Sequence, residues 1–544
     1  MRSLSRVALA TVLAIGLASA VACSRAAAPP PPTWDVTRLV GGGSPFHGVH
    51  GLRVGWDGTL YAVSVIGQSV YAVNPGTGAV TTFVGPPNGM GDDIAIAPDD
   101  GTFVWTAIED GIVHARAPNG TLRRLMEGQK GVNAVSFSRD GTRLFVSLVF
   151  YGDALYELDR SGVRPPRRIL ENLGGLNAFE VGADGMIYGP LVFKNQLVRI
   201  NPDSGELTVI ADGFSSPGAV KLDFKGSAYV LESATRRLLR VDLRTGQKTL
   251  VATLPHGVDN LAFDATRTRL FVSLSEVNGI AEVNVATGAV REVVQPAVLT
   301  SPTGLAVMTA NGTDTLYLGD LFGGVKTIDG QTGAVQATPV EIFQPAHVSA
   351  TDRHLIVVSQ VFGAMQRIDR ATFAKLDEWS GLKSPGDALE APNGDIFVAE
   401  TGSGSLLRIA GPAAADRKPV VTGLGGPLGL AWAGPNTVYV TETSAGLVSR
   451  IDIGSGSRRV IAEGLANPEG IAVTADGELL VVEVGARRIV RISPPGGDRT
   501  IVAANLPIGL SYGPSLYRGI AVTPSAIYIN SDIENAIYKL TPPR

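Results

Sequence analysis

The feature that most constrains this chain is a sequence pattern repeated about twelve times, at a spacing near 40 residues, from about His50 to the C-terminus. One copy contains the runs Gly470-Ile-Ala-Val-Thr-Ala-Asp476-Gly477-Glu-Leu-Leu-Val-Val-Glu483, Ala486-Arg-Arg-Ile-Val-Arg-Ile492 and Arg499-Thr-Ile-Val-Ala503. The runs are rich in β-branched residues, and Asp-Gly or Gly-Gly pairs separate them. Each copy is therefore expected to form four short strands joined by tight turns.

The turns recur at matched places along the chain. The first turn of a copy is found at Asp57-Gly58, Asp100-Gly101, Asp140-Gly141, Asp184-Gly185 and Asn393-Gly394. A four-stranded unit of this length is the size of a propeller blade, and 66 Gly and 34 Pro suit a chain with many turns. We predict an all-β chain that forms two tandem six-bladed β-propellers, with about twelve four-stranded blades. A split of seven and five blades and a single ring of twelve are the alternatives.

The order of the strands suggests how each ring closes. Residues Val36–Val40 resemble the outermost strand of a blade, whereas the last copy ends at Leu540 without one. If each half closes on itself, Val36–Val40 pairs with the strands between Asp259 and Val285, and Val290–Val294 pairs with the strands between Arg518 and Leu540. This predicts a first propeller over residues 34–288 and a second over residues 289–544.

The N-terminus has the pattern of an export signal. Arg2 and Arg6 precede the apolar run Val7–Ala18, and small residues follow up to Cys23, the only cysteine of the chain. We predict a signal peptide with a lipobox over residues 1–23, lipidation of Cys23, and an Ala/Pro-rich tether over residues 24–33. Ordinary cleavage after Ala18-Ser-Ala20 is the alternative. Both predict an exported protein of the cell envelope, without an intrachain disulfide.

The charge distribution limits the partners. The formal net charge is −4, and the Arg and Lys residues are scattered among comparable numbers of acids. A nucleic-acid partner is not expected, because no basic face is visible. The lipid anchor is the only expected link to a membrane. We predict a monomer whose partner is a protein, a glycan or a small polar ligand.

Polar residues recur where the innermost strand of each blade is expected to begin. Propeller ligands bind at the ends of the central channel, where these positions converge. In the first half this position is held by His50, Asp92, Asn133, Asn177, Gly218 and Asp259. The neighbouring position adds Asp93 and Asn260. Oxygen donors around one axis predict a divalent cation bound by His50, Asp92, Asn133, Asn177 and Asp259: calcium, or zinc or manganese because of the histidine nitrogen. The alternative is that Asn and Asp only form local turns.

The second half is less regular. The corresponding position is held by Thr303, Ala346, Gly386, Leu428, Glu469 and Arg518, with His347 and Asp387 next to it. These residues could line a polar pocket, although loop-end hydrogen bonding explains them more simply. Acidic residues that end the second strand of a blade, at Glu232, Glu400, Glu442 and Glu483, are expected to be solvated. Gly509-Leu-Ser511-Tyr-Gly513 matches a nucleophile elbow, but we expect it in a loop between blades.

Several copies resemble known repeats. Pro468-Glu-Gly-Ile-Ala-Val473 with Asp476-Gly477, and Ser384-Pro-Gly-Asp387 with Pro392-Asn-Gly394-Asp-Ile-Phe-Val-Ala-Glu400, are similar to NHL-type and gluconolactonase/senescence-marker-type propeller repeats, as is Gly426-Pro-Leu-Gly-Leu430. That resemblance implies one divalent cation held by Glu, Asn and Asp, and Asn133, Asn177 and Asp259 fall in similar places. His50 stands where a glutamate would be expected. Thr441-Glu442 and Ala399-Glu400 are similar to streptogramin-lyase propellers, but the His-Gly pairs lie in the other half, at His47-Gly48 and His50-Gly51.

Two functions follow from these patterns. The first is a binding or interaction scaffold of the cell envelope. The second, implied by the gluconolactonase resemblance, is a metal-dependent hydrolase of lactones or esters, in which the cation polarises a carbonyl and Asp92 or Asp93 accepts a proton.

Overall fold

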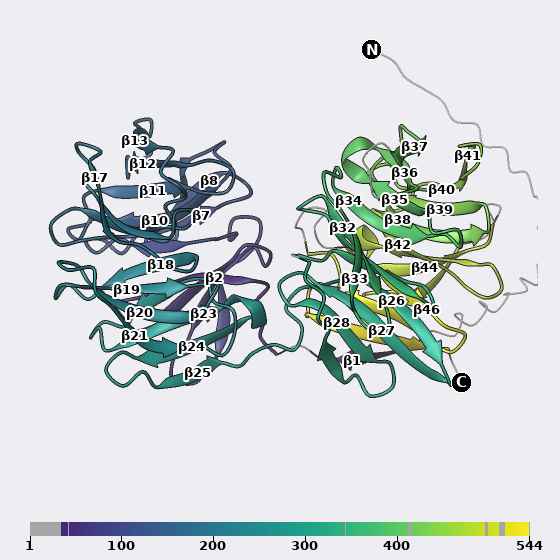
Figure 1. The fold of residues 1–544 in the computed structure, drawn as a ribbon, viewed down its shortest axis with the longest axis horizontal. Coiled ribbons are helices and arrows are strands. Elements are labelled where there is room, and N and C mark those ends of the chain that lie inside the picture. Colours follow the sequence, from purple (N-terminus) through teal and green to yellow (C-terminus); the bar gives the residue numbers. More distant parts are fainter. Residues whose placement is uncertain are drawn as a thin grey trace, which may run out of the picture.

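The computed structural model describes residues 34–41, 43–342, 344–411, 416–494, 499–510 and 517–542. Its strands form twelve four-stranded sheets. They are the blades of two six-bladed β-propellers, which confirms the predicted fold (Figure 1). Within these ranges three short 3₁₀ helices accompany them: η1 (Ser275–Val277), η2 (Thr401–Ser403) and η4 (Val484–Ala486). In the described ranges, no helix is long and apolar enough to cross a membrane. Cys23 and the other residues of the predicted signal and tether lie outside these ranges.

The first propeller contains β2 to β25, four consecutive strands to a blade. They are β2 (Val49–Val54), β3 (Leu60–Ser64), β4 (Ser69–Val73), β5 (Val80–Val84), β6 (Ile94–Ile96), β7 (Phe103–Ala107), β8 (Ile112–Arg116), β9 (Leu122–Met126), β10 (Val132–Phe137), β11 (Leu144–Leu148), β12 (Ala154–Leu158), β13 (Arg167–Glu171), β14 (Glu180–Val181), β15 (Ile187–Leu191), β16 (Gln196–Ile200), β17 (Leu207–Ala211), β18 (Pro217–Leu222), β19 (Ser227–Glu232), β20 (Arg237–Asp242), β21 (Lys248–Thr253), β22 (Leu261–Phe263), β23 (Arg269–Leu274), β24 (Gly279–Asn284) and β25 (Val290–Val294).

The second propeller contains β26 to β48 together with the N-terminal strand β1. They are β1 (Asp35–Val40), β26 (Pro302–Ala310), β27 (Thr313–Asp320), β28 (Gly324–Asp329), β29 (Val335–Ala337), β30 (His347–Ala350), β31 (His354–Ser359), β32 (Ala364–Asp369), β33 (Lys375–Trp379), β34 (Pro385–Glu390), β35 (Ile396–Glu400), β36 (Ser405–Ile409), β37 (Arg417–Val421), β38 (Pro427–Gly434), β39 (Thr437–Glu442), β40 (Leu447–Asp452), β41 (Arg458–Ala462), β42 (Pro468–Val473), β43 (Leu479–Glu483), β44 (Arg488–Ile492), β45 (Arg499–Ala503), β46 (Ile520–Val522), β47 (Ile527–Ser531) and β48 (Ala536–Thr541).

Within a blade, burial decreases from the channel to the rim. The inner strand β10 is buried along its whole length, whereas the outer strand β13 is largely exposed. The core lies between the blades, where β-branched and leucine side chains of one sheet pack on the next, as Val104 and Val113 do on Val135. This layered packing explains why the sequence shows short apolar runs and no helical periodicity.

The closure predicted for the two rings is wrong. Strand β1 pairs antiparallel with β48, with Val36 opposite Leu540, and so completes the last blade of the second propeller. Strand β25 pairs with β24 and completes the last blade of the first propeller. The division at residue 288 therefore does not follow the sheets, because the N-terminal strand belongs to the second propeller and residues 290–294 belong to the first.

The physical reason is the length of chain that each pairing must close. Strand β25 follows β24 through a short turn, so their pairing costs little loop-closure entropy. Once β25 is used there, the last blade of the second ring lacks an outer strand, and the N-terminal segment is free to supply it. The first ring closes without a strand shared between its two ends: Leu52 and Leu60 of its first blade pack against Phe271 and Ile280 of its last, and Arg291 donates a hydrogen bond to the carbonyl oxygen of Pro75.

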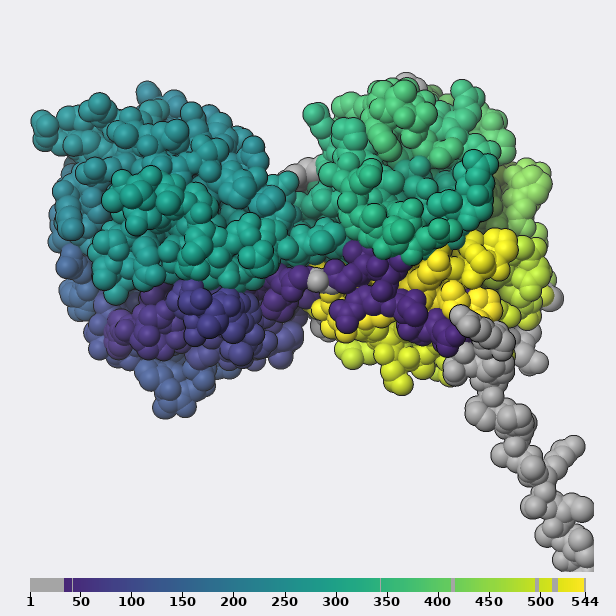
Figure 2. Space-filling model, turned by 90° about the horizontal axis from the view of Figure 1, so that it is seen from below, coloured from purple at the N-terminus to yellow at the C-terminus, as the bar shows by residue number. Residues whose placement is uncertain are grey.

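Two segments connect the propellers, and Figure 2 shows the resulting narrow waist between two globular lobes. Asn278 of the first propeller donates from Nδ2 to the carbonyl oxygens of Phe46, at 2.7 Å, and Thr300, at 2.6 Å. Asn535 of the second propeller donates to the same Phe46 oxygen at 2.7 Å. Asn278 thus binds both connecting segments to the first propeller, and Asn535 binds the N-terminal one to the second.

The same ends of the two channels face one another. In every blade the inner strand begins at the end of the propeller that carries the turn between the second and third strands. Ile66, in the turn between β3 and β4, lies in one apolar cluster with Leu321, in the turn between β27 and β28, together with Phe322 and Leu510. The blade ends that carry the predicted polar residues therefore meet between the propellers (Figure 1).

Candidate functional site

Three predicted residues meet at the end of the first channel that faces the second propeller, here called the first mouth. His50 is in β2, Asp92 precedes β6, and Asp259 precedes β22. The Nδ1 atom of His50 lies 3.7 Å from Asp92 Oδ1 and 3.6 Å from Asp259 Oδ2. The side chains of His50 and Asp92 are 15% and 14% exposed, and that of Asp259 is 37% exposed. Residues from the first, second and sixth blades thus form one ionisable cluster.

The second propeller contributes one wall of the first mouth. The ring of Phe322 lies edge-on to His50, with centroids 5.9 Å apart. A Cβ on Gly48 would come within 2.6 Å of the same phenylalanine, so glycine is needed for this close approach, and its φ is +71°. The first mouth therefore opens into the space between the two propellers.

Burial changes the protonation of this cluster. Burial raises the pKa of Asp92 to about 8, with the neighbouring charges of Asp259 and Asp93 acting in the same direction and His50 opposing them. Burial alone would lower the pKa of His50, but the carboxylates of Asp259 and Asp92 outweigh it, so the pKa of His50 is raised. At neutral pH the cluster therefore holds protons that a bound cation would displace.

The two predicted asparagines differ in their surroundings. Asn177 Oδ1 accepts a hydrogen bond of 2.9 Å from the backbone of Ala178, as expected for a local turn. Asn133 is 4% exposed, and within the described ranges its side-chain amide makes no hydrogen bond with the protein. In the same part of the chain, no hydrogen bond or ion pair joins either asparagine to His50, and no group of three or more His, Cys, Asp or Glu residues is arranged to hold a metal ion. The cation stays a prediction.

Asp93 has a different environment from its neighbour Asp92. It is 2% exposed, and its Oδ2 accepts a 3.1 Å hydrogen bond from the backbone of Val135 in the next blade. Its Oδ1 accepts a 3.2 Å hydrogen bond from Asn260 Nδ2. The buried ammonium group of Lys221 adds a favourable charge interaction, which acts against the rise that burial causes in the pKa of Asp93. Of the two predicted proton acceptors, Asp92 is therefore the one at the first mouth.

Acids at related positions link neighbouring inner strands in both propellers. Each carboxylate accepts a hydrogen bond from a backbone N–H of the following blade; the pairs are Asp93 with Val135, Glu180 with Leu222, Asp387 with Leu430, and Glu469 with Arg518. These bonds hold adjacent blades in register along the channel. Sequence reasoning missed this role, although an acidic residue near the start of an inner strand was its visible signal.

The corresponding end of the second channel, here called the second mouth, contains a more tightly packed cluster. His347 Nε2 lies 2.8 Å from Asp387 Oδ1, and the ring of Tyr517 packs edge-on against His347 with centroids 4.7 Å apart. All three residues are at most 6% exposed. Burial raises the pKa of Tyr517 well above its usual value, and the charges of Asp387 and Glu469 add to this effect. Among the described residues His347 Nδ1 has no hydrogen-bond partner.

The other predicted residues of the second propeller form ion pairs. Arg518 Nη1 lies 3.2 Å from Glu469 Oε1, and its Nη2 lies 2.5 Å from Asp532 Oδ2. The side chains of Arg518 and Asp532 are 4% and 0% exposed. Thr303 donates from Oγ1 to backbone oxygens, as loop-end hydrogen bonding predicts. His347 therefore pairs with Asp387, and Glu469 pairs with Arg518. Tyr517 lies close to an acid of each pair.

The expectation that the strand-end glutamates are solvated is wrong. Glu232, Glu400, Glu442 and Glu483 are at most 6% exposed. Each accepts a backbone hydrogen bond from the loop that leads into its own blade; the donors are Ser215, Lys383, Gly425 and Ala466. Loops at the channel mouth expose backbone N–H groups, and a buried carboxylate satisfies them. Gly509 and Leu510 donate to Asp532 in the same way, in the loop between β45 and β46, whereas Ser511 lies outside the described ranges.

Comparison with known proteins finds likeness only among solved structures. No protein-family model matches the chain, and no curated protein matches it. Virginiamycin B lyase from Staphylococcus aureus aligns at 15% identity over 60% of this chain and 94% of its own, with a TM-score of 0.29. Extracellular domains of two putative hybrid two-component systems from B. thetaiotaomicron align at 11% and 10% identity, each over 94% of this chain and 83% of theirs, with TM-scores of 0.33 and 0.35. The fold assignment accordingly rests on the strand pairing of this chain.

Proposed function

We propose that this protein is an exported binding protein of the cell envelope that holds its ligand at the first mouth, with a divalent cation as part of the site. The observation that carries the proposal is that Asp92 and Asp259, from two other blades, both lie within 3.7 Å of His50 Nδ1. Carboxylates that are withdrawn from water and brought together lower stability unless protons or a cation neutralise them. The predicted export signal, which ends at Cys23, supports the compartment.

Two distances at the first mouth are compatible with a shared cation, although the side chains do not form a complete set of ligands as they stand among the described residues. Two atoms that bind one ion, each at about 2.0 to 2.6 Å, lie at most about 5 Å apart. Both distances from His50 Nδ1 satisfy this condition. The second ring nitrogen of His50 is buried and has no hydrogen-bond partner among the described residues. A site that mixes an imidazole with carboxylates favours zinc or manganese over calcium.

The expected ligand is polar and reaches the first mouth from between the propellers. A bound cation would attract an oxygen atom of the ligand, while Asn133 offers an amide without a protein partner in the described ranges. Phe322 would contact an apolar part of the same ligand. A protein, a glycan or a small polar molecule could supply these groups, and each would contact both propellers.

Titration calorimetry with zinc, manganese and calcium chloride tests the proposal. If binding requires Asp92 to lose its proton, a pKa of about 8 makes the affinity about 50-fold weaker at pH 6 than at pH 8. Asp259→Asn should abolish binding. The control is Asp110→Asn, which removes an exposed carboxylate at the same end of the propeller. If none of the three ions binds at pH 8, the cation is excluded.

As a second candidate we propose metal-dependent hydrolysis of a lactone or ester, the activity implied by the gluconolactonase resemblance. The position of Asp92 at the first mouth, beside His50, is the observation in its favour, because a proton acceptor must lie where the substrate binds. When bound, the cation would polarise the carbonyl of the substrate. Asp92→Asn should then abolish metal-dependent hydrolysis of gluconolactone in a pH-stat assay. Cation binding without hydrolysis of gluconolactone or simple esters would leave only the binding function.

A further inference from the structure

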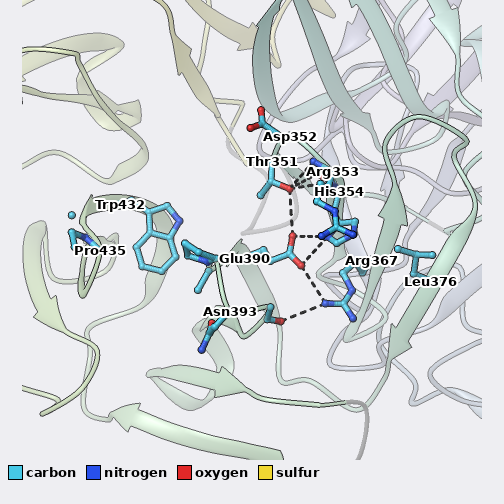
Figure 3. Close-up of a pocket in the computed structure, with 14 residues that line it drawn as sticks. Thr351, Asp352, Arg353, His354, Arg367, Leu376, Glu390, Asn393, Trp432 and Pro435 are labelled. Carbon is cyan, nitrogen blue, oxygen red and sulfur yellow. Dashed lines mark hydrogen bonds and ion pairs between the residues drawn. The ribbon is translucent and has the colours of Figure 1, made fainter.

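A pocket of about 690 Å³ opens at the end of the second propeller opposite the second mouth (Figure 3). Its walls are the turns that join inner strands to second strands in three consecutive blades: β30 to β31, β34 to β35, and β38 to β39. The volume lies in the range usual for small-molecule sites. None of the residues at the two mouths lines this pocket, so it is separate from the proposed cation site.

One wall of the pocket is aromatic. Trp432, at the end of β38, is half-buried, and the ring of Phe397 packs edge-on against it with centroids 5.8 Å apart at 83°. This contact fixes the indole ring while part of it lines the pocket. In Figure 3 Trp432 stands on one side of the pocket, with Glu390 in the middle and His354 on the other side. A fixed, partly exposed indole is a platform for stacking.

The opposite wall is a built polar cluster around Glu390, whose side chain is 6% exposed. The carboxylate accepts hydrogen bonds from His354 Nδ1 at 2.8 Å, Arg367 Nη1 at 3.2 Å and Thr351 Oγ1 at 3.4 Å. Because Nδ1 donates to Glu390, the neutral imidazole keeps Nε2 as an acceptor, and the protonated ring offers it as a donor. The cluster thus fixes the orientation of the His354 ring, and Nε2 of that ring remains available for a ligand.

The rim adds one charge of each sign. Asp352 and Arg353 are exposed, and in the described part of the chain neither side chain makes a hydrogen bond or an ion pair with the protein. The pocket therefore presents donors and acceptors in similar number beside an aromatic face. A phosphate or a polyanion would meet two carboxylates, and a hydrocarbon would leave the charged groups unsatisfied. A neutral ring that carries many hydroxyl groups matches both walls.

The geometry points to a saccharide-binding site: the apolar face of a sugar ring packs on Trp432, and its hydroxyl groups bond to His354 Nε2, Asp352 and Arg353. Each sugar hydroxyl both donates and accepts, which suits the mixed groups of the opposite wall. The site goes beyond the proposed function, because it needs neither the first mouth nor a cation.

Calorimetry with maltotriose, cellotriose and chitotriose tests the assignment. At least one trisaccharide should bind, and Trp432→Ala should weaken its binding by about tenfold or more. Trp432→Tyr should retain most of the affinity. The control is Trp56→Ala, which removes an indole that is 69% exposed on the first propeller; it should leave binding unchanged. A chelator should have no effect, which separates this result from the outcome at the first mouth.

Hydrogen exchange of the unmodified protein provides a test that does not depend on the folding of a variant. The trisaccharide should protect the three turns that line the pocket, at residues 350–354, 390–396 and 434–437, from exchange. Lack of binding of all three sugars at about 10 mM overturns the assignment. Protection confined to other blades, or an equal loss of affinity in Trp56→Ala, overturns it as well.

Discussion

Strand β1 is expected to stabilise the second propeller, although in the sequence it stands before the first. The perturbation is an internal deletion of Trp34–Gly41 that leaves the preceding segment in place. It removes five residue pairs with β48. We count about one hydrogen bond for each pair, at about 0.5 to 1 kcal/mol net in this largely exposed strand, and about 2 kcal/mol for the buried side chain of Val40. The loss is then about 4.5 to 7 kcal/mol. This equals a large part of the stability of a typical domain.

Hydrogen exchange measured by mass spectrometry can locate the effect. In the deletion variant, β46, β47 and β48 should lose protection because β48 becomes an unpaired edge, whereas β22 to β25 should exchange as before. A synthetic peptide of residues Trp34–Gly41 should restore the protection, and deletion of residues 24–32 serves as the control. Faster exchange in β22 to β24 with unchanged β46 to β48 would refute the assignment of this strand to the second propeller.

Three further outcomes are expected. Asp92 and His50 both have raised pKa values in the folded state, so the folded state holds protons that the unfolded state releases. The free energy of unfolding should therefore fall as the pH rises from about 4 to about 8. In metal-free buffer Asp92→Asn should flatten this dependence and raise the melting temperature at about pH 8. A melting temperature that is independent of pH over this range would contradict it. Glu442→Gln should destabilise the second propeller by about 1 to 3 kcal/mol in urea unfolding, because Gly425 N–H, Ser449 and Arg458 lose a charged partner, whereas Glu463→Gln, at an exposed site, should have little effect. Cys23→Ser should move the protein from the membrane fraction to the soluble envelope fraction, and unchanged fractionation would exclude lipidation.

The repeat pattern alone predicted the blades, because turn residues and β-branched runs act locally. Asp57-Gly58 and Asp476-Gly477 form turns in which the glycine has positive φ, and each apolar run between such turns forms one strand. The same periodicity placed His50, Asp92 and Asp259 at matched positions, and these three do meet. It could not distinguish Asp92, at the first mouth, from Asp93, which bonds to the next blade, since both are acids at the start of one strand.

The sequence by itself therefore determined the four-stranded unit, the number of blades and the matched positions of His50, Asp92 and Asp259. Only the tertiary structure decided which ring the N-terminal strand completes, because pairing between β1 and β48 joins residues at opposite ends of the chain and leaves no local pattern. It likewise decided that Glu442 is buried, that Phe322 reaches His50 from the other propeller, and that Trp432 faces Glu390 across a pocket. Each of these depends on contacts between separate blades, whereas a sequence pattern reports the preferences of neighbouring residues.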